Sequence, residues 1–328
     1  MEHLEPLEHR RVLSRDPPNA EAAEGAFAHL LTPAAMRFVR CNFPVPRLDE
    51  AHQLEIAGEV SQAGRLPLAH LKTLPSVTLT VVTECAGNGR ARIEPPVDGD
   101  PWRNGAVSAA QWTGVPLRSV LALKDTAVEV VFTGADGGAY QRSLPREIAM
   151  DPATLVAWEM NGTPIPARFG GPLRLVVPGW YGMASVKWLA RIEAVTEPFR
   201  GHFQAERYVY GPGVPVTRIR VKSMFTDVPE SPRAGLPTRV TGLAWGGEGV
   251  ARVEVGIDGE WNEARLVGPI LPHAWRRFEL HWTPPAPGRY RLCCRALGAH
   301  GETQPRNPLW NPLGYGANGI ETRDIVAR

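Results

Sequence analysis

The sequence predicts a mixed α+β domain followed by an all-β sandwich, and three observations lead to this fold class. The chain has 328 residues, which is more than one typical small core organises and indicates two domains. Up to residue 212, expected helices and strands follow one another without a regular strand–helix–strand alternation. Beyond residue 212, stretches that alternate apolar and polar residues recur between short turns, as in a β-sandwich.

The first residues predict a tail and a short helix. Residues 1–19 are expected to be an exposed tail. Arg10 and Arg11 faintly resemble a twin-arginine export signal, but the polar residues 14–21 offer no apolar core. Cytoplasmic residence is therefore expected, with the periplasm as the alternative. Residues 20–31 are rich in alanine with apolar spacing, which favours a short helix.

The domain expected over residues 20–212 contains one strand of special interest. Residues 78–83 are rich in β-branched side chains and are bounded by a glycine-containing loop. They predict a buried strand that delivers Cys85 into a turn. Three further strands and one short helix are expected at residues 128–132, 155–160, 173–177 and 116–123.

The second domain is expected over residues 213–328. The Gly- and Pro-rich segment 210–215 marks the boundary. Turns such as Gly246-Gly247, Asp258-Gly259 and Pro287-Gly288 separate the alternating stretches beyond it. Their number and spacing predict an immunoglobulin-like sandwich of roughly a hundred residues. The expected strands are residues 239–245, 251–257, 276–282 and 289–296.

Composition and charge narrow the function classes. Hydrophobic residues make up 43% and charged residues 21% of the chain, and the net charge is +2. These values are ordinary for a globular protein and give no reason to expect a nucleic-acid or membrane partner. No apolar run is long enough to span a bilayer. The four cysteines show no spacing typical of a disulfide framework, a zinc site or a c-type haem attachment.

The sharpest local feature is the segment Cys85-Ala86-Gly87-Asn88-Gly89-Arg90. Two glycines permit a tight turn whose N–H groups can point inward as an anion nest. The neighbouring Arg90 favours the thiolate form of Cys85, and a thiolate is the soft ligand that a redox metal can use. A small buried cysteine in a tight turn is the alternative interpretation, and chemistry alone favours it.

Several segments, in order along the chain, resemble the sulfite oxidase family of molybdenum-molybdopterin oxidoreductases. The resemblance runs from about residue 30 to residue 315, and it includes the cysteine segment above. The other matching segments are residues 38–46 (FVRCNFPVP), Trp102, residues 105–108 (GAVS), Trp112, residues 159–162 (EMNG), residues 177–179 (VPG), residues 186–188 (VKW), residues 242–245 (GLAW) and Trp310-Asn311.

The resemblance implies a molybdenum-molybdopterin cofactor. Cys85 would supply the only protein bond to the metal. The residues implied to bind the pterin and its phosphate are Phe38, Val39, Arg40, Cys41, Asn42, Asp136, Phe169, Arg174, Ser185, Val186 and Lys187. The cations among them, Arg174 and Lys187, are what a buried phosphate needs. Without the family, such residues are usually solvated charges or turn residues.

The resemblance also implies an enzyme that transfers an oxygen atom to a small anionic substrate, most simply sulfite to sulfate. Arg40 and Arg90 would bind the anion, Tyr208 would donate a hydrogen bond, and Trp102 would wall the pocket. Two arginines in a dry pocket favour a small dianion over neutral molecules. Electrons would pass to an external acceptor such as a cytochrome. The immunoglobulin-like domain would pair two chains into a homodimer, since two-fold closure is the commonest symmetry.

Three positions depart from the family's pattern and keep alternatives open. Asn42 and Phe169 stand where histidines are usual, and Leu313 stands where another substrate-binding arginine is expected. Losing a cation lowers selectivity for a doubly charged anion. The chain could therefore be a sibling enzyme acting on another oxyanion or on a sulfoxide, including in the reductive direction. A catalytically silent member of the fold is the third hypothesis.

Overall fold

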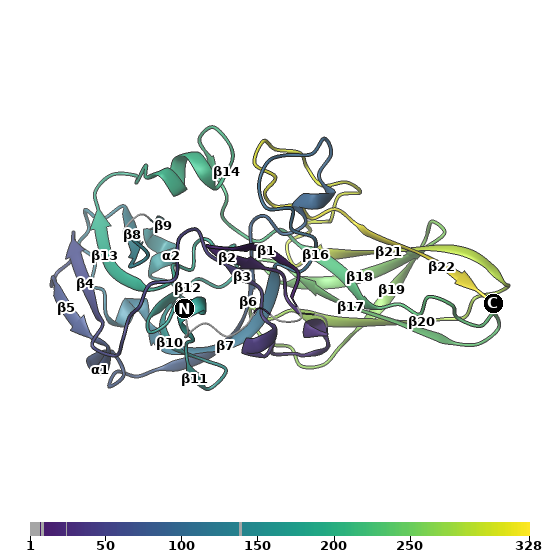
Figure 1. Cartoon of the computed structure of the whole chain (residues 1–328), viewed down its shortest axis with the longest axis horizontal. Coiled ribbons are helices and arrows are strands. Elements are labelled where there is room, and N and C mark those ends of the chain that lie inside the picture. The colour runs from purple at the N-terminus through teal and green to yellow at the C-terminus, as the bar shows by residue number, and fades with distance from the viewer. Residues whose placement is uncertain (1–6, 8–9, 24, 138–139) are drawn as a thin grey trace.

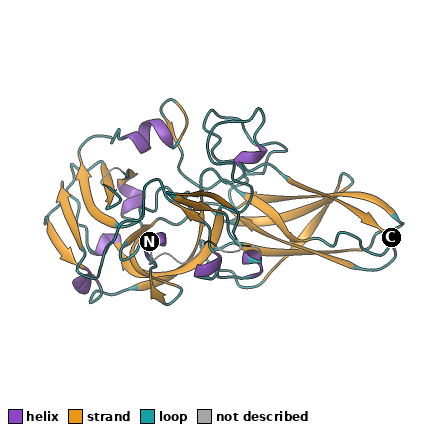
Figure 2. Ribbon diagram, viewed as in Figure 1, coloured by secondary structure: helices purple, strands orange, loops and turns teal. Residues whose placement is uncertain are grey.

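The computed structural model describes residues 7, 10–23, 25–137 and 140–328. The molecule is elongated, with several small sheets at one end and one large sheet at the other, where the C-terminus lies (Figure 1). Strands dominate (Figure 2). The α-helices are single turns, α1 (Leu68–Leu71) and α2 (Arg146–Ala149). The first part of the chain is therefore richer in strands than the expected α+β class.

The N-terminal segment forms a sheet, so the prediction of an exposed tail is wrong for residues 10–19. Strands β1 (Val12–Arg15), β2 (Pro18–Ala20) and β3 (Val39–Arg40) pair in the order β1-β2-β3. The buried Asn19 side chain accepts a hydrogen bond from the Cys41 backbone N–H at 2.8 Å. Strand pairing thus orders this segment, although its polar composition predicts an exposed tail.

The helix predicted at residues 20–31 is also wrong, although residue 24 lies outside the described residues. Only a 3₁₀ turn forms there, over Ala26–Ala28. It follows Gly25, whose φ of 78° is left-handed and breaks a right-handed helix. The short helix expected at residues 116–123 is likewise reduced to a 3₁₀ turn over Leu117–Ser119.

A five-stranded sheet carries the candidate metal ligand at the end of one strand. It orders β11-β10-β7-β6, and β12 also pairs with β10. The strands predicted at residues 78–83, 155–160 and 173–177 are confirmed. β6 becomes fully buried toward its end, directly before Cys85. The bounds are β6 (Val77–Glu84), β7 (Val107–Pro116), β10 (Leu155–Met160), β11 (Thr163–Pro164) and β12 (Arg174–Val176).

A second five-stranded sheet, in the order β5-β4-β13-β8-β9, packs on the other side of the same apolar core. The strand predicted at residues 128–132 is confirmed as β8. The bounds are β4 (Gln53–Gly58), β5 (Gly64–Pro67), β8 (Glu129–Gly134), β9 (Gln141–Pro145) and β13 (Leu189–Val195). A π-helical turn (Phe203–Arg207) then leads into the hairpin of β14 (Val209–Gly211) and β15 (Val214–Pro215).

The large sheet has the order β16-β17-β20-β19-β18-β21-β22 and folds over so that β16 approaches β21. Four of its strands confirm the sequence predictions. The charged strands β19 and β22 were not anticipated, and neither was β16. The bounds are β16 (Lys222–Asp227), β17 (Thr238–Trp245), β18 (Val250–Ile257), β19 (Glu260–Val267), β20 (Arg276–Trp282), β21 (Gly288–Gly298) and β22 (Glu321–Ala327).

The main apolar core is continuous between the two ends of the molecule. Met224, Leu243, Trp245 and Trp275 of the large-sheet region join the cluster that fills the space between the smaller sheets. The large sheet is thus packed against the region that holds Cys85. Within the described residues, the search for a helix with the length and apolarity of a membrane span found none.

Candidate functional site

Cys85 lies in a tight turn directly after β6. Its backbone N–H donates to the Ala106 carbonyl at 2.9 Å, and its own carbonyl accepts the Asn88 N–H at 2.9 Å. Gly89 has a φ of 89°, which closes the turn at low cost. Neighbouring residues on a strand point to opposite faces. Glu84 therefore turns toward the large sheet, and Cys85 faces a cavity.

The Cys85 thiol is almost fully buried, with 7% exposure. Burial raises its pKa, while the charges of Arg40 and Arg90 and the backbone N–H of Gly87 act in the opposite direction. Arg40 and Arg90 thus favour the thiolate, and desolvation has the larger effect on the pKa of the Cys85 thiol. A bound metal is the strong charge that deprotonates a coordinating thiol outright.

One cavity, which we call the cradle, extends from Cys85 and is lined by the segment around β3, by the ends of β6 and β12, and by loop residues. Its space measures about 700 Å³, part of which is open to solvent. Predicted cofactor residues that line it are Phe38, Arg40, Asn42, Asp136, Phe169, Arg174, Ser185 and Lys187. The structure therefore brings together residues that lie up to 149 positions apart in the chain (187 − 38 = 149).

The cradle holds buried polar atoms that have no hydrogen-bond partner among the described residues. They include Nε and Nη1 of Arg37, Nε of Arg174 and Oδ1 of Asp136. Burial and the charge of Arg174 lower the pKa of Arg37 to about 9. Burial lowers the pKa of Arg174 to about 10. Burying two guanidinium groups that repel each other costs folding free energy unless an anion binds between them.

Arg37 and Arg174 are also fixed in place. Both guanidinium groups lie over the Trp112 ring, at 5.5 Å and 5.0 Å from its centroid. Arg174 Nη1 donates to the Phe169 carbonyl at 2.7 Å. Fixed cations with free N–H groups match the phosphate of a pterin cofactor, so the residues present fit the group.

Lys187 supplies another cation at the same wall. Its Nζ donates to the Arg40 carbonyl at 2.9 Å and to the Arg168 carbonyl at 3.2 Å, and it lies 2.9 Å from Cys41 Sγ. Burial lowers the pKa of Lys187, with Cys41 acting in the opposite direction. Ser185 accepts the Val177 N–H at 3.0 Å, so its hydroxyl hydrogen stays available to a ligand.

Three predicted cofactor residues lie behind the cradle wall. Val39, Cys41 and Val186 are each 1% exposed, and none is among the lining residues. Val39 and Cys41 pack in an apolar cluster with Trp112 and Phe169. Their side chains therefore shape the wall, and only backbone groups remain to them for contact with a ligand.

A second cavity, which we call the funnel, opens toward solvent on the other side of Cys85. All four residues predicted for the substrate site line it: Arg40, Arg90, Trp102 and Tyr208. The Arg90 guanidinium is held by the carbonyls of Leu313 (3.1 Å) and Asp100 (3.0 Å). Trp102 is fully buried and packs with Phe38 and Ala106 beside Cys85.

The cradle and the funnel share one constriction, which contains Cys85, Arg40, Asn42 and Tyr208. Arg40 donates to the Asn42 Oδ1 at 2.8 Å and to the Asn19 Oδ1 at 3.2 Å. The Asn42 amide lies within 3.3 Å of the Tyr208 hydroxyl. Asn42 thus ties the arginine to the tyrosine at the point where the two cavities meet.

Sequence reasoning missed several cradle residues, above all Arg37. A buried unpaired arginine is rare, and its position directly before residues 38–46 was the only available signal. Tyr140 was missed as well, although its buried hydroxyl is fixed by donating to the Met183 carbonyl at 2.6 Å. The other missed lining residues are Thr83, Ala86, Arg168, Gly182 and Met183.

Comparison with known proteins agrees with this geometry. The oxidoreductase molybdopterin binding domain family matches residues 42–203. Sulfite oxidase of Gallus gallus is 35% identical over 346 residues, which covers 93% of this chain and 75% of that protein. An NADH nitrate reductase of Petunia hybrida is 28% identical over 359 residues, covering 93% of this chain and 40% of that protein.

A solved structure has the same fold along almost the whole chain. The sulfane dehydrogenase SoxCD from Paracoccus pantotrophus has a TM-score of 0.84 at 28% identity, covering 99% of this chain and 86% of that chain. The chain spans 63–65% of the length of the rat and mouse sulfite oxidases that it matches. On these findings the chain belongs to the sulfite oxidase family of molybdopterin-dependent oxidoreductases, and its cofactor is molybdenum-molybdopterin.

Proposed function

We propose that this protein oxidises a small sulfur oxyanion, most simply sulfite to sulfate, and passes two electrons to an external acceptor. The observation that carries the proposal is the constriction at Cys85. There a cavity with unpaired buried cations meets a solvent-open cavity lined by Arg40, Arg90 and Tyr208. A cofactor held in the first cavity would present its metal to an anion that enters through the second.

Cys85 is the proposed protein ligand of molybdenum. Its turn is fixed by backbone hydrogen bonds at Ala106 and Asn88, so the sulfur is preorganised to bind. Arg37, Arg174 and Lys187 would hold the phosphate of the pterin, and Phe169 would pack against the cofactor. When bound, the cofactor supplies the oxygen-atom transfer and the two-electron redox chemistry.

The protein's own contribution is to bind and orient the anion. Arg40 places a positive charge at the constriction and Arg90 places another in the funnel beside it. Low exposure strengthens their attraction for a dianion. Tyr208, which is 5% exposed, would donate its hydroxyl hydrogen to a substrate oxygen. Trp102 closes the wall behind them and limits the size of the substrate.

A sibling reaction is the second candidate, and Leu313 is the observation that favours it. The backbone carbonyl of Leu313 holds Arg90, but its side chain brings no charge to the funnel. A singly charged anion such as nitrate, or a sulfoxide, would lose less from the missing cation than sulfite would. The proposal predicts turnover with sulfite and an artificial one-electron acceptor. Turnover only in the reductive direction, with nitrate or a sulfoxide, would replace it.

Metal analysis separates both candidates from a catalytically silent member of the fold. Protein expressed with molybdate available is expected to contain one molybdenum and one pterin per chain. A properly folded preparation that lacks both would support the silent alternative and would end the proposal.

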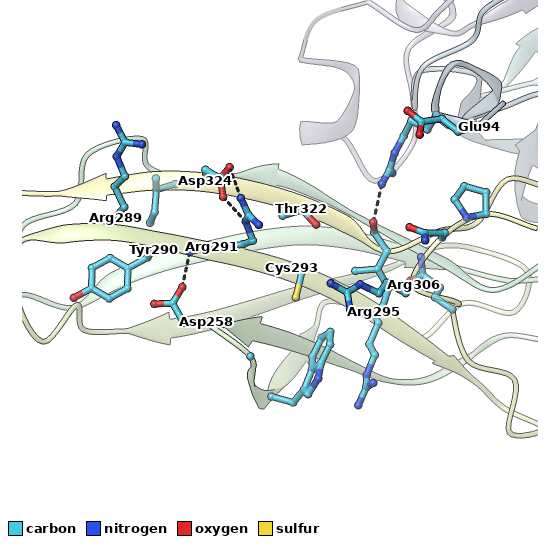
Figure 3. Close-up of a pocket in the computed structure, with 18 of the residues that line it drawn as sticks. Glu94, Asp258, Arg289, Tyr290, Arg291, Cys293, Arg295, Arg306, Thr322 and Asp324 are labelled. Carbon is cyan, nitrogen blue, oxygen red and sulfur yellow. Dashed lines mark hydrogen bonds and ion pairs between the residues drawn. The ribbon is translucent and has the colours of Figure 1, made fainter. Parts of the chain in front are cut away.

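We further propose that the large sheet is an immunoglobulin-like domain, over residues 213–328, that pairs two chains into a homodimer. A surface pocket on this sheet is lined by charges of both signs, including Arg291, Asp324, Arg295 and Arg306 (Figure 3). Trp261 lines the same pocket. A face with both signs of charge can be complementary to itself under two-fold symmetry. The mass in solution tests this, since a monomer at micromolar concentration would contradict it.

The electron acceptor and the location of the protein remain predictions of the sequence. A cytochrome is the expected acceptor, to be tested by reduction of a cytochrome in a mixture with sulfite. Cytoplasmic residence is to be tested by cell fractionation.

A further inference from the structure

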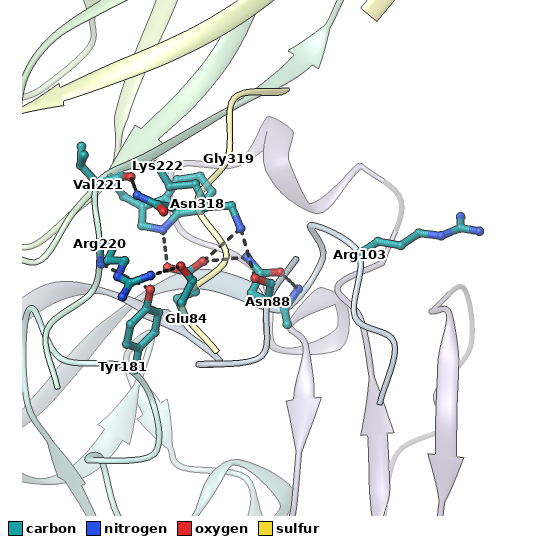
Figure 4. A network of polar contacts seen from close by, with 12 residues as sticks. Glu84, Asn88, Arg103, Tyr181, Arg220, Val221, Lys222, Asn318 and Gly319 are labelled. Atoms are coloured by element: carbon teal, nitrogen blue, oxygen red, sulfur yellow. Dashed lines mark hydrogen bonds and ion pairs between the residues drawn. The ribbon is translucent and has the colours of Figure 1, made fainter. Parts of the chain in front are cut away.

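Lys222, the first residue of β16, reaches out of the large sheet to the underside of the Cys85 turn. Its side chain is 2% exposed, and so is the side chain of Glu84, which it meets. Lys222 Nζ lies 3.5 Å from Glu84 Oε1 and donates to the Asn88 carbonyl at 3.3 Å (Figure 4). A charge carried by the large sheet is thus buried beneath the candidate metal ligand.

The Glu84 carboxylate is fully paired. Oε1 also accepts the Asn88 side-chain N–H at 2.8 Å, and Oε2 accepts the Trp245 indole N–H at 2.8 Å. Lys222 and Trp245 come from the neighbouring strands β16 and β17. The large sheet therefore holds Glu84, the residue directly before Cys85, through polar contacts from two different side chains.

Asn88 links Glu84 to the opposite side of the turn. Its Oδ1 accepts the Ala106 N–H at 3.0 Å, and its backbone N–H donates to the Cys85 carbonyl. Ala106 in turn accepts the Cys85 N–H. The network of Glu84, Asn88 and Lys222 thus fixes both sides of the turn from which the Cys85 sulfur projects.

The backbone is adapted to the approach of Lys222. A Cβ atom at Gly89 would lie 3.1 Å from Lys222 Nζ and 3.1 Å from the Ala317 carbonyl. The glycine therefore serves two purposes, because its φ of 89° is left-handed and its missing side chain leaves room for the ammonium group.

Stability alone is a poor explanation for such a pair. Burial raises the pKa of Glu84 and lowers the pKa of Lys222, and each opposes the shift of the other. Apolar residues of similar volume often stabilise a protein as well as a buried ion pair does. A buried pair of this kind is better suited to selecting one geometry of the groups around it.

We propose that Lys222 is a positioning residue for the metal site, which sets the geometry of the Cys85 turn from the large sheet through Glu84 and Asn88. The inference rests on the proposed role of Cys85. It makes the packing of the large sheet against the turn a determinant of metal geometry, in addition to any role in pairing chains.

The test compares wild type with Lys222→Met, with the double variant Glu84→Gln/Lys222→Met, and with Trp275→Phe as a matched control. Trp275 is buried in the same continuous core, and its indole N–H donates to the Leu30 carbonyl at 3.0 Å rather than to the network of Glu84, Asn88 and Lys222. Four quantities are measured on each: the Tm, the molybdenum content, the Mo(V) EPR spectrum, and kcat and KM with sulfite.

Lys222→Met leaves a lone buried carboxylate, so its Tm and its molybdenum content are expected to fall. The double variant removes both charges and is expected to regain most of the Tm. Its EPR spectrum should nevertheless stay shifted or broadened, and its kcat about 10-fold or more below wild type, as for groups that orient metal ligands. KM should change little, because Arg40 and Arg90 are untouched. Trp275→Phe should lower the Tm and keep the wild-type spectrum.

The double variant decides the matter even if Lys222→Met does not fold. A double variant with a recovered Tm and the spectrum and kcat of wild type would show that the pair is merely structural, and the inference would be overturned. Wild-type protein without molybdenum would instead be a failure of the proposed function, so the two failures are distinguishable.

Discussion

The two sides of one peptide segment differ sharply in how their polar groups are satisfied. On the side of Glu84, both carboxylate oxygens are paired, with Asn88, Lys222 and Trp245. On the side of Cys85, the buried Arg37 and Arg174 keep N–H groups without a partner among the described residues. Buried polar groups that are paired need no ligand, whereas buried cations without a partner indicate a binding site for an anion. The comparison therefore assigns different roles to two adjacent residues: Glu84 belongs to a structural hydrogen-bond network, and Cys85 faces the proposed binding site.

The largest expected effect comes from Cys85→Ser. A hydroxyl is a poor replacement for a thiolate, so turnover should be abolished and molybdenum content should fall. The Tm of the cofactor-free protein should stay close to wild type, because the volume change is small. Metal analysis and thermal unfolding measure the two results. Sulfite turnover at the wild-type rate in this variant would remove Cys85 from the metal site.

Arg90→Gln tests the funnel side of the comparison. Removing one of two cations from a buried anion site is expected to cost about 2–3 kcal/mol in apparent binding, or roughly 30- to 150-fold in KM for sulfite. Since Arg90 is held by the Leu313 and Asp100 carbonyls, its loss should leave the pterin content unchanged. A KM equal to wild type would exclude Arg90 from substrate binding.

Arg37→Met tests the cradle side. The variant is expected to be more stable than wild type without the cofactor, and to bind the cofactor less tightly. The cofactor-free variant should gain about 1–3 kcal/mol in free energy of unfolding, because an unpaired buried charge is removed. The folded-state pKa of Arg37 is lowered to about 9. The gain should therefore be full below pH 9 and should shrink as the pH rises above it.

The same variant should bind the pterin cofactor less tightly, which the pterin content of purified protein measures. A variant that is less stable without cofactor, and equally loaded with it, would show that Arg37 is an ordinary core residue.

The smallest effect is expected from Leu313→Arg, which adds a cation to the funnel. A partly exposed charge should improve binding of a dianion by about 1 kcal/mol, or roughly 5-fold in KM. The gain should shrink at high ionic strength. A KM for sulfite that rises in this variant would indicate that the funnel is adapted to a different substrate.

The sequence predicted the strand before Cys85 well because its signal is local. β-branched residues end at a glycine turn, and β6 follows that pattern to Glu84. It failed at residues 10–19, where the strand pairing depends on contacts with residues 39–41. Charged strands such as β22 were missed for the same reason, since their hydrogen-bond partners lie in a distant part of the chain.

The candidate site shows the same division. Arg40 and Arg90 could be named because they belong to segments that resemble the family, and Tyr208 could be named because the resemblance implies its role. Arg37 could not, because burial and the absence of a partner are properties of the folded state. The pairing of Glu84 with Lys222 joins residues 138 positions apart. No local sequence pattern predicts such a pair.

The central claim is that the sulfur of Cys85 binds molybdenum between the cradle and the funnel. Anomalous electron density collected at the molybdenum edge from crystals of the cofactor-loaded protein tests it most directly. The account predicts one strong peak within bonding distance of the Cys85 sulfur, bordered by Arg40 and Tyr208. A peak elsewhere, or a loaded crystal in which Cys85 stays unbonded, would contradict it.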